Sequence, residues 1–270
     1  MTSSSPRRTV LVTGASAGLG LAFARVFAAH GFDLVLTARR EKRLRTVADE
    51  LTARHQVAAR IVPDDLEDPE APARIVGAIA ADGVTIDALV NNAGYGLPGK
   101  YVDTVWDAQA RFLQIMVTAY AELVHRVLPG MVERNYGRIV NVSSVAGLVP
   151  GTPGHTLYAA AKAFLVKFSQ SLALETRRRG VHVTALCPGF TYTEFHDVNH
   201  TRPIVSARVP RAMWLDADDV ARQGFDGVMQ GRLQVVPGLS YKAIVALTRL
   251  LPESLVIKAT LRQSRRFRAQ

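Results

Sequence analysis

Residues 9–20 read Thr-Val-Leu-Val-Thr-Gly-Ala-Ser-Ala-Gly-Leu-Gly, an apolar run that passes directly into a glycine-rich turn. The run suits a buried strand, and an amphipathic stretch of helical length, residues 19–30, follows the turn. In such a turn Gly14 permits a tight bend, Gly18 lets the backbone approach a pyrophosphate, and Gly20 allows the helix to pack closely on the strand. The free N–H groups at the start of the helix favour an anion. The glycines alone would also fit a merely structural turn, but their position between strand and helix predicts a dinucleotide site.

Outward from this turn, strand-like runs alternate with helical stretches along most of the chain. No hairpin dipeptide joins two of these runs, so the alternation predicts βαβ units and a parallel sheet. The expected fold class is α/β, a single doubly wound parallel sheet of seven strands with helices on both faces, as in Rossmann-like proteins. The expected strands are 9–13, 33–37, 57–62, 87–91, 138–142, 182–187 and 233–236, and the expected helices are 19–30, 41–55, 69–81, 104–128, 156–179 and 217–229.

The length of the chain bounds its domain organisation. A chain of 270 residues can form one large α/β domain, so residues 1–270 are expected to fold as a single dinucleotide-binding and catalytic domain. Residues 190–216 follow the sixth strand without clear periodicity, and ligands of such sheets bind at the carboxyl ends of the strands. We therefore expect a substrate loop or lid there. Residues 238–270 are expected to form a basic helical extension.

The net charge of +10 comes from 33 lysines and arginines against 23 aspartates and glutamates. Residues 241–270 hold seven basic side chains and one acidic side chain, which together contribute +6. Two interpretations stay open: a terminal helix packed on the body with a solvated basic end, or a surface that contacts anionic lipid or an acidic acyl carrier. The apolar run at 243–247 is too short to span a bilayer. Nucleic acid is not expected as a partner, because the basic residues are not interleaved with aromatic ones.

The chain has one cysteine, Cys187, which excludes an internal disulfide and a cysteine-based metal cluster. A reducing compartment is expected, and with no export-like segment at the N-terminus the cytoplasm is the predicted location. Cys187 ends an apolar run, which favours a core residue over a nucleophile. His196 and His200 are spaced as metal ligands can be, near Glu194, but no supporting motif accompanies them and no metal is expected.

The spacing of the glycine turn resembles that of the short-chain dehydrogenase/reductase family. Three further stretches match the family's pattern in its order: Asn-Asn-Ala-Gly at 91–94, Tyr-Ala-Ala-Ala-Lys at 158–162 with a serine pair at 143–144, and Pro-Gly at 188–189 with Thr193. The resemblance covers residues 9 to about 236. It implies an oxidoreductase that binds a nicotinamide dinucleotide, and a homodimer or homotetramer.

The end of the second expected strand indicates which nicotinamide cofactor is bound. A carboxylate there would accept from the ribose 2′-OH, whereas an arginine would pair with a 2′-phosphate. Ala38, followed by Arg39 and Arg40, therefore favours NADP(H), helped by the Ser16 hydroxyl, although both arginines could simply be solvated. The resemblance implies cofactor contacts from Gly14, Ser16, Gly18, Leu19, Gly20, Arg39, Arg40, Asp65 and Leu66, from Asn91, Ala93 and Gly94 beside the adenosine ribose, and from Tyr158, Lys162, Pro188, Gly189, Phe190 and Thr193 toward the nicotinamide.

The chemistry is expected from Tyr158, Lys162 and Ser144. Tyr158 and Lys162 lie four residues apart in a helical stretch and share a face, so an ammonium beside the phenol would favour the phenolate. Tyr158 is assigned as the acid in reduction or the base in oxidation, and the resemblance implies that Lys162 also holds the nicotinamide ribose. Ser144 would donate to the substrate carbonyl oxygen, with Ser143 as the competing candidate.

One position departs from the family pattern. The long fourth helix usually carries an asparagine that orders a water in the proton relay, and Met116 aligns there. A thioether is a weak acceptor and cannot donate. Gln114 or another water path replaces the asparagine, or the relay is impaired, or the alignment is shifted by one position.

Two functions of different classes follow. The first is reduction of a ketone or oxidation of a secondary alcohol, and details such as Ala-Phe at 163–164 and Thr-Glu-Phe at 193–195 resemble bacterial reductases of lipid-like 3-oxo substrates. A hydrophobic, lipid-like or steroid-like substrate is therefore expected. The alternative is a catalytically weak NADPH-binding sensor or scaffold, which Met116 favours and the intact trio of serine, tyrosine and lysine opposes.

Overall fold

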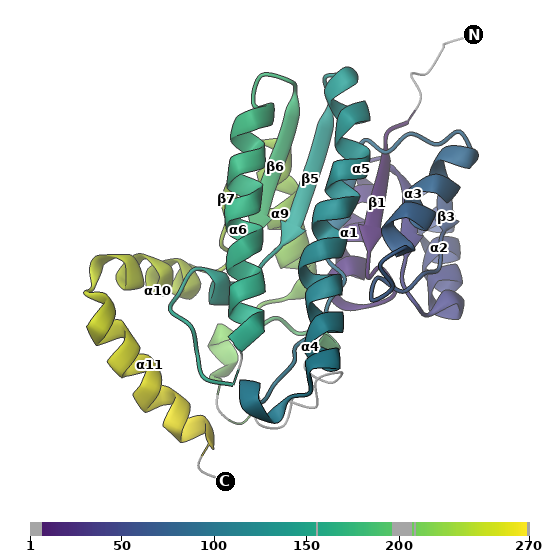
Figure 1. Cartoon of the computed structure of the whole chain (residues 1–270). Coiled ribbons are helices and arrows are strands. Elements are labelled where there is room, and N and C mark those ends of the chain that lie inside the picture. The colour runs from purple at the N-terminus through teal and green to yellow at the C-terminus, as the bar shows by residue number, and fades with distance from the viewer. Residues whose placement is uncertain (1–6, 155, 196–206, 208, 269–270) are drawn as a thin grey trace.

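The structure is a computed structural model, and it describes residues 7–154, 156–195, 207 and 209–268. One sheet of seven strands has the order β3-β2-β1-β4-β5-β6-β7, and every neighbouring pair is parallel (Figure 1). The predicted doubly wound parallel sheet is confirmed. The strands are β1 (Thr9–Thr13), β2 (Asp33–Thr37), β3 (Ala59–Ile61), β4 (Ala88–Asn91), β5 (Gly137–Val142), β6 (Val181–Leu186) and β7 (Gln234–Val235).

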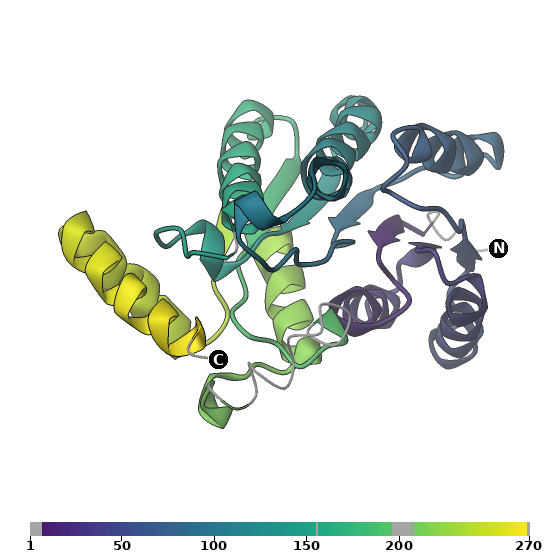
Figure 2. The ribbon, with the colours of Figure 1, turned by 60° about the horizontal axis from the view of Figure 1, so that its bottom comes forward.

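Helices cover both faces of the sheet, and each face has its own apolar core (Figures 1 and 2). Such two-sided covering explains why the strands read as continuous apolar runs. One face carries α1 (Gly18–Ala29), α2 (Glu41–His55) and α9 (Ala217–Met229), and the other carries α3 (Ala71–Ala81), α4 (Trp106–Leu113), α5 (Ala119–Glu133) and α6 (Thr156–Thr176). Short 3-10 turns lie at η1 (Tyr101–Asp103), η3 (Val145–Gly147) and η4 (Arg211–Met213).

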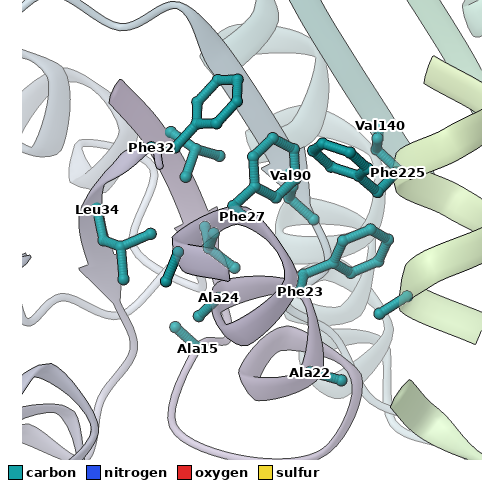
Figure 3. Close-up of a cluster of buried hydrophobic side chains, with 14 of the residues drawn as sticks. Ala15, Ala22, Phe23, Ala24, Phe27, Phe32, Leu34, Val90, Val140 and Phe225 are labelled. Carbon is teal, nitrogen blue, oxygen red and sulfur yellow. The ribbon is translucent and has the colours of Figure 1, made fainter. Parts of the chain in front are cut away.

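Aromatic packing holds α1 in place behind the glycine turn. The ring of Phe27 meets the rings of Phe32 and Phe225 edge-on, each with centroids 5.0 Å apart (Figure 3). Phe23, one turn earlier, is fully buried, and a Cβ at Gly224 of α9 would lie 2.7 Å from its ring. Because α1 is fixed by this cluster, its N-terminus has a defined position at the carboxyl edge of β1.

The helix expected at 104–128 differs from the observed chain in two ways. It is broken by a π-helical turn, η2 (Gln114–Thr118), between α4 and α5. It also continues past Pro129 to Glu133, although a proline removes one backbone hydrogen bond from a helix. The last turn of α5 buries Met131 completely in the core, and this apolar burial offsets the lost bond.

The C-terminal region forms an arm of two helices, α10 (Leu239–Leu250) and α11 (Glu253–Arg268). Figure 1 shows α11 standing off the body beyond α10, and the yellow C-terminal helix also stands apart from the body in Figure 2. Among the described residues, no helix combines the length and the apolar character needed to cross a membrane.

Candidate active site

The glycine turn joins β1 to α1 in a shape that larger side chains would block. Gly14 and Gly18 have φ of +67° and +55°, a backbone region that favours glycine. A Cβ at Gly20 would lie 2.3 Å from the Gly14 carbonyl oxygen, so α1 packs directly on the turn. Asn92 Nδ2 donates to the Thr13 carbonyl oxygen at 2.9 Å and holds the turn against the end of β4. This cradle of close backbone fits the pyrophosphate of a dinucleotide.

The arginines at the end of β2 diverge. Arg40 donates from Nε and a terminal nitrogen to Ser16 Oγ, at 3.2 and 3.0 Å, and so lies beside the glycine turn. Arg39 instead faces Asp65 and Glu67, with nitrogen to oxygen distances of 3.7 and 3.8 Å. Of the two predicted phosphate-binding arginines, Arg40 is therefore the one placed with Ser16, and Arg39 borders the predicted adenine side.

The side chain of Asn91 is fully buried within the sheet. It donates to the Tyr120 carbonyl oxygen at 3.1 Å and to Asn141 Oδ1 at 3.0 Å. Asn141 in turn donates to Ser169 Oγ at 2.9 Å, which ties β4, β5 and α6 together. Leaving this buried network would cost the desolvation of several polar groups, so we assign the Asn91 side chain a structural role.

The predicted trio meets at the carboxyl ends of β5 and β6. Ser144 follows β5, its Oγ accepts from the Ala146 N–H at 3.1 Å, and it forms a hydrogen bond with the phenol of Tyr158 from the first turn of α6. Lys162, one turn later, is buried, and its Nζ donates to the Val142 carbonyl oxygen at 2.7 Å. The competing serine, Ser143, donates to the Lys162 carbonyl oxygen at 2.7 Å and is buried, which leaves Ser144 as the serine beside the phenol.

The pKa of Tyr158 is not lowered in the structure, although the neighbouring Lys162 was expected to lower it. Burial raises the pKa of Tyr158, and the hydrogen bond from Ser144 only partly opposes it. Burial also lowers the pKa of Lys162 to about 7. The Lys162 Nζ lies 5.7 Å from the centroid of the Tyr158 ring. In the free protein, burial is the largest effect on the pKa of both residues.

The lowered pKa of Lys162 predicts a pH-dependent stability. Between pH 7 and its ordinary value of 10.5, the unfolded chain binds more protons at this lysine than the folded chain, so the free energy of unfolding rises with pH. Relative to Lys162→Met, wild type should gain up to about 1.4 kcal/mol per pH unit above pH 7. Denaturant unfolding of wild type and of Lys162→Met from pH 7 to 9 measures this difference, and titration of the Cys187 thiol contributes equally to both proteins.

The control for this prediction is Lys167→Met, which removes an exposed lysine from the same helix. Its pH profile should run parallel to that of wild type. A Lys162→Met profile that also runs parallel to wild type between pH 7 and 9 would show that this lysine titrates alike in the folded and unfolded chains.

Met116 lies inside the π-helical turn and is fully buried. A Cβ at Gly94 would lie 2.4 Å from its sulfur, so Met116 packs against the Asn-Asn-Ala-Gly stretch. Tyr120, the next turn along, donates to the Ala93 carbonyl oxygen at 2.9 Å, and its ring centroid lies 5.7 Å from Lys162 Nζ. Gln114 has a buried Nε2 with no hydrogen-bond partner among the described residues. Met116 therefore has a packing role, and the polar side chains near it are those of Gln114 and Tyr120.

The stretch after β6 is bound to the C-terminal arm. The Phe190 N–H donates to the hydroxyl of Tyr241 at 3.0 Å, and that hydroxyl donates to the Met213 carbonyl oxygen at 2.7 Å. A Cβ at Gly189 would fall on the Tyr241 ring, 2.0 Å from its nearest atom. Tyr241 thus supports the predicted nicotinamide side from α10. Of the predicted loop 190–216, residues 196–206 and 208, with His196 and His200, lie outside the described residues.

Sequence reasoning missed Tyr241 and one further residue near the glycine turn, Arg43, whose terminal nitrogen lies 2.7 Å from a carboxylate oxygen of Glu194. Tyr241 lies about fifty residues from Phe190 along the chain, and its tail sequence gave no signal of this contact. Arg43 could have been found, because it follows Arg40 by three residues and such positions are neighbours on one helix face.

A parallel sheet in this strand order, with a glycine turn after β1, defines a dinucleotide-binding protein of the doubly wound α/β class. The model of the short chain dehydrogenases matches residues 8–202. The chain belongs to the short-chain dehydrogenase/reductase family of oxidoreductases, as its motifs predict.

Individual relatives agree with this family. An uncharacterized oxidoreductase of Myxococcus xanthus is 32% identical over 250 residues, covering 92% of this chain and 94% of that protein. A short-chain dehydrogenase from Sphingobium yanoikuyae in complex with NADPH has a TM-score of 0.79 and 32% identity, over 90% of this chain and 93% of its own. The bulky-bulky ketone specific alcohol dehydrogenase from Comamonas testosteroni has a TM-score of 0.75 and 27% identity, over 98% of this chain and 96% of its own.

Proposed function

We propose that this oxidoreductase exchanges hydride between NADP(H) and a ketone or secondary alcohol. The observation that carries the proposal is the hydrogen bond between Ser144 and Tyr158, at the same sheet edge as the glycine turn. When bound, the nicotinamide supplies or accepts the hydride. The Ser144 hydroxyl donates to the substrate carbonyl oxygen, where negative charge develops. Tyr158 gives its proton to that oxygen in reduction and takes it back in oxidation.

The remaining site residues bind and orient the cofactor. Lys162 holds the nicotinamide ribose and, once charged there, favours ionisation of the Tyr158 phenol. The glycine turn holds the pyrophosphate, and Arg40 with Ser16 holds the 2′-phosphate of NADP(H). The NADPH bound to the Sphingobium relative supports this choice of cofactor.

We propose a bulky, hydrophobic substrate such as a lipid-like or steroid-like ketone. The ring of Phe195 lies beside that of Tyr158, with centroids 6.0 Å apart. Phe190, Met213 and Leu148 gather near Val145 in one apolar cluster close to the predicted nicotinamide side. The bulky ketone specificity of the Comamonas relative, whose chain is matched over nearly its full length, also supports this class.

The test is NADPH consumption with a panel of ketones that runs from small polar to bulky apolar. The proposed function requires turnover with the bulky apolar members. Saturable NADPH binding without consumption of NADPH by any ketone would favour the sensor or scaffold instead.

Light scattering on the same preparation tests the expected homodimer or homotetramer.

We further propose that the C-terminal arm docks on a membrane surface of anionic lipids. The outward side of α10 carries Leu239 and Leu250, 83% and 82% exposed, with Leu247 beside them. The exposed Lys242 and Arg249 are on the same helix. An apolar stripe with cationic neighbours suits the interface of an anionic bilayer, and a membrane is also where a lipid-like substrate would be found.

Sedimentation with vesicles tests this docking. The protein should bind phosphatidylcholine vesicles containing phosphatidylserine, less so at high salt and less so without phosphatidylserine. The double variant Leu239→Gln/Leu250→Gln should lower partitioning by about tenfold or more, because two large apolar side chains no longer enter the bilayer. Leu174→Gln, which changes a 61% exposed leucine on α6, is the matched control. Equal binding of the double variant and wild type, or binding only to an acidic carrier protein, would contradict the proposal.

A further inference from the structure

The short segment 193–195 lies between the glycine turn and the candidate catalytic tyrosine. A Cβ at Gly18 would lie 3.0 Å from Thr193 Cβ, so the start of the segment lies on the turn. The ring of Phe195, at its end, packs beside that of Tyr158. Glu194 is the residue between these two contacts.

The Glu194 carboxylate pairs with two arginines. One carboxylate oxygen lies 2.9 Å from a terminal nitrogen of Arg40, and the other lies 2.7 Å from a terminal nitrogen of Arg43. Partial burial would raise the pKa of Glu194, but hydrogen bonds from Arg43 and Arg40 outweigh it and hold the pKa below its usual range. The carboxylate is thus ionised at neutral pH and uses donors from both guanidinium groups.

The same donors are suited to a phosphate monoester. Guanidinium groups form charge-assisted hydrogen bonds with phosphate oxygens as they do with carboxylates. Arg40 also donates to Ser16 in the glycine turn, so this cationic cluster borders the place where a dinucleotide's adenosine ribose is expected. A dianionic phosphate and the Glu194 carboxylate would repel one another there and would compete for the same N–H groups.

We infer that Glu194 is an internal competitor for the 2′-phosphate of NADP(H), and that Arg43 is a further residue of the 2′-phosphate site. The inference rests on the proposed NADP(H) function. In the free protein Glu194 pairs with Arg40 and Arg43, and binding of the 2′-phosphate displaces it. NAD(H) has no 2′-phosphate and leaves the pairs intact. Glu194 therefore weakens the binding of NADP(H) but not that of NAD(H), and so reduces the preference of the protein for NADP(H).

Calorimetric titration with adenosine fragments tests the competition without any turnover. The probes are adenosine 2′,5′-bisphosphate, which carries the 2′-phosphate, and 5′-AMP, which lacks it. Glu194→Gln should bind the bisphosphate about three- to tenfold more tightly than wild type, the size expected for two half-exposed ion pairs. Its affinity for 5′-AMP should stay within about twofold of wild type, because only the 2′-phosphate competes with the carboxylate.

Two controls and one further variant sharpen the result. Glu41 lies at the start of α2, the helix that carries Arg43, and pairs with Arg45. The Glu41→Gln variant should bind both probes as wild type does. Glu194→Asp keeps the charge and should retain most of the competition. Arg43→Gln should weaken binding of the bisphosphate and leave 5′-AMP binding unchanged. Thermal unfolding of each variant checks that it is folded.

The outcomes separate this inference from the proposed function. If wild type binds the bisphosphate more tightly than 5′-AMP but Glu194→Gln does not increase that affinity, the inference is wrong and the proposed cofactor stands. If wild type does not distinguish the two probes, the assignment of NADP(H) itself fails. A gain of similar size for both probes would show that Glu194 obstructs the whole adenosine site, which also contradicts selective competition.

Discussion

Replacing Tyr158 by phenylalanine will lower kcat by about a thousandfold, since general acid catalysis by a positioned side chain contributes about a hundredfold to ten-thousandfold. The phenol is the proton donor placed with Ser144, and the variant keeps the ring while removing the proton. The dissociation constant for NADPH should rise by far less than kcat falls, at most about tenfold, because Tyr158 is only one of the predicted cofactor contacts and the glycine turn and Arg40 are untouched. Steady-state turnover and NADPH fluorescence titration measure the two quantities.

The raised pKa of Tyr158 favours its role as the proton donor. Burial keeps the phenol protonated at neutral pH in the free protein, which suits a proton donor in ketone reduction. Tyr101→Phe, which removes the hydroxyl of a 50% exposed tyrosine, is the control and should keep full turnover. A Tyr158→Phe variant with kcat within about tenfold of wild type would exclude Tyr158 as the essential acid.

The double variant Ala38→Asp/Arg40→Ala will lower the NADPH to NADH ratio of kcat/KM by at least about a hundredfold. Removing Arg40 takes charge-assisted hydrogen bonds from the 2′-phosphate, each worth about 1.5–3 kcal/mol. The new carboxylate at position 38 repels that phosphate and accepts from the ribose 2′-OH of NADH. Both effects act on the same ratio, which initial rates with each cofactor measure.

Single variants then distinguish the arginines. Arg40 donates to Ser16, whereas Arg39 faces Asp65 and Glu67, so Arg40→Ala should change the cofactor ratio more than Arg39→Ala. Arg45→Ala, on the same helix but paired with Glu41, should leave the ratio unchanged. A larger effect from Arg39 would mean that its side chain leaves the two carboxylates when the cofactor binds.

The sheet could be predicted from sequence because its signals are local. The runs at 9–13 and 33–37 coincide with β1 and β2, and the pattern at 41–55 coincides with α2. Continuous apolar runs and helical periodicity depend on residues close together in the chain. The prediction that the helix ends before Pro129 was wrong. Burial of Met131 in the core stabilises the last turn of α5, and this packing involves residues distant in sequence.

The site could be predicted only in part, for the same reason. The motif residues Ser144, Tyr158 and Lys162 lie together, as their positions after β5 and on α6 require. The partners of Asn91 and of Glu194 come from segments far away in sequence, and only the fold brings them into contact. The pKa of Tyr158 depends mainly on burial, with an opposing hydrogen bond from Ser144, and burial was not visible in the spacing of the motif.

The most direct test of the central claim is the fate of the hydride. NADPH carrying deuterium at both C4 positions of the nicotinamide is incubated with the protein and a bulky apolar ketone, and the alcohol is examined by mass spectrometry. The proposed function predicts deuterium on the carbinol carbon of the alcohol, and formation of this alcohol about a thousandfold more slowly with Tyr158→Phe. Tight NADPH binding with no deuterium in any product across the ketone panel would contradict it.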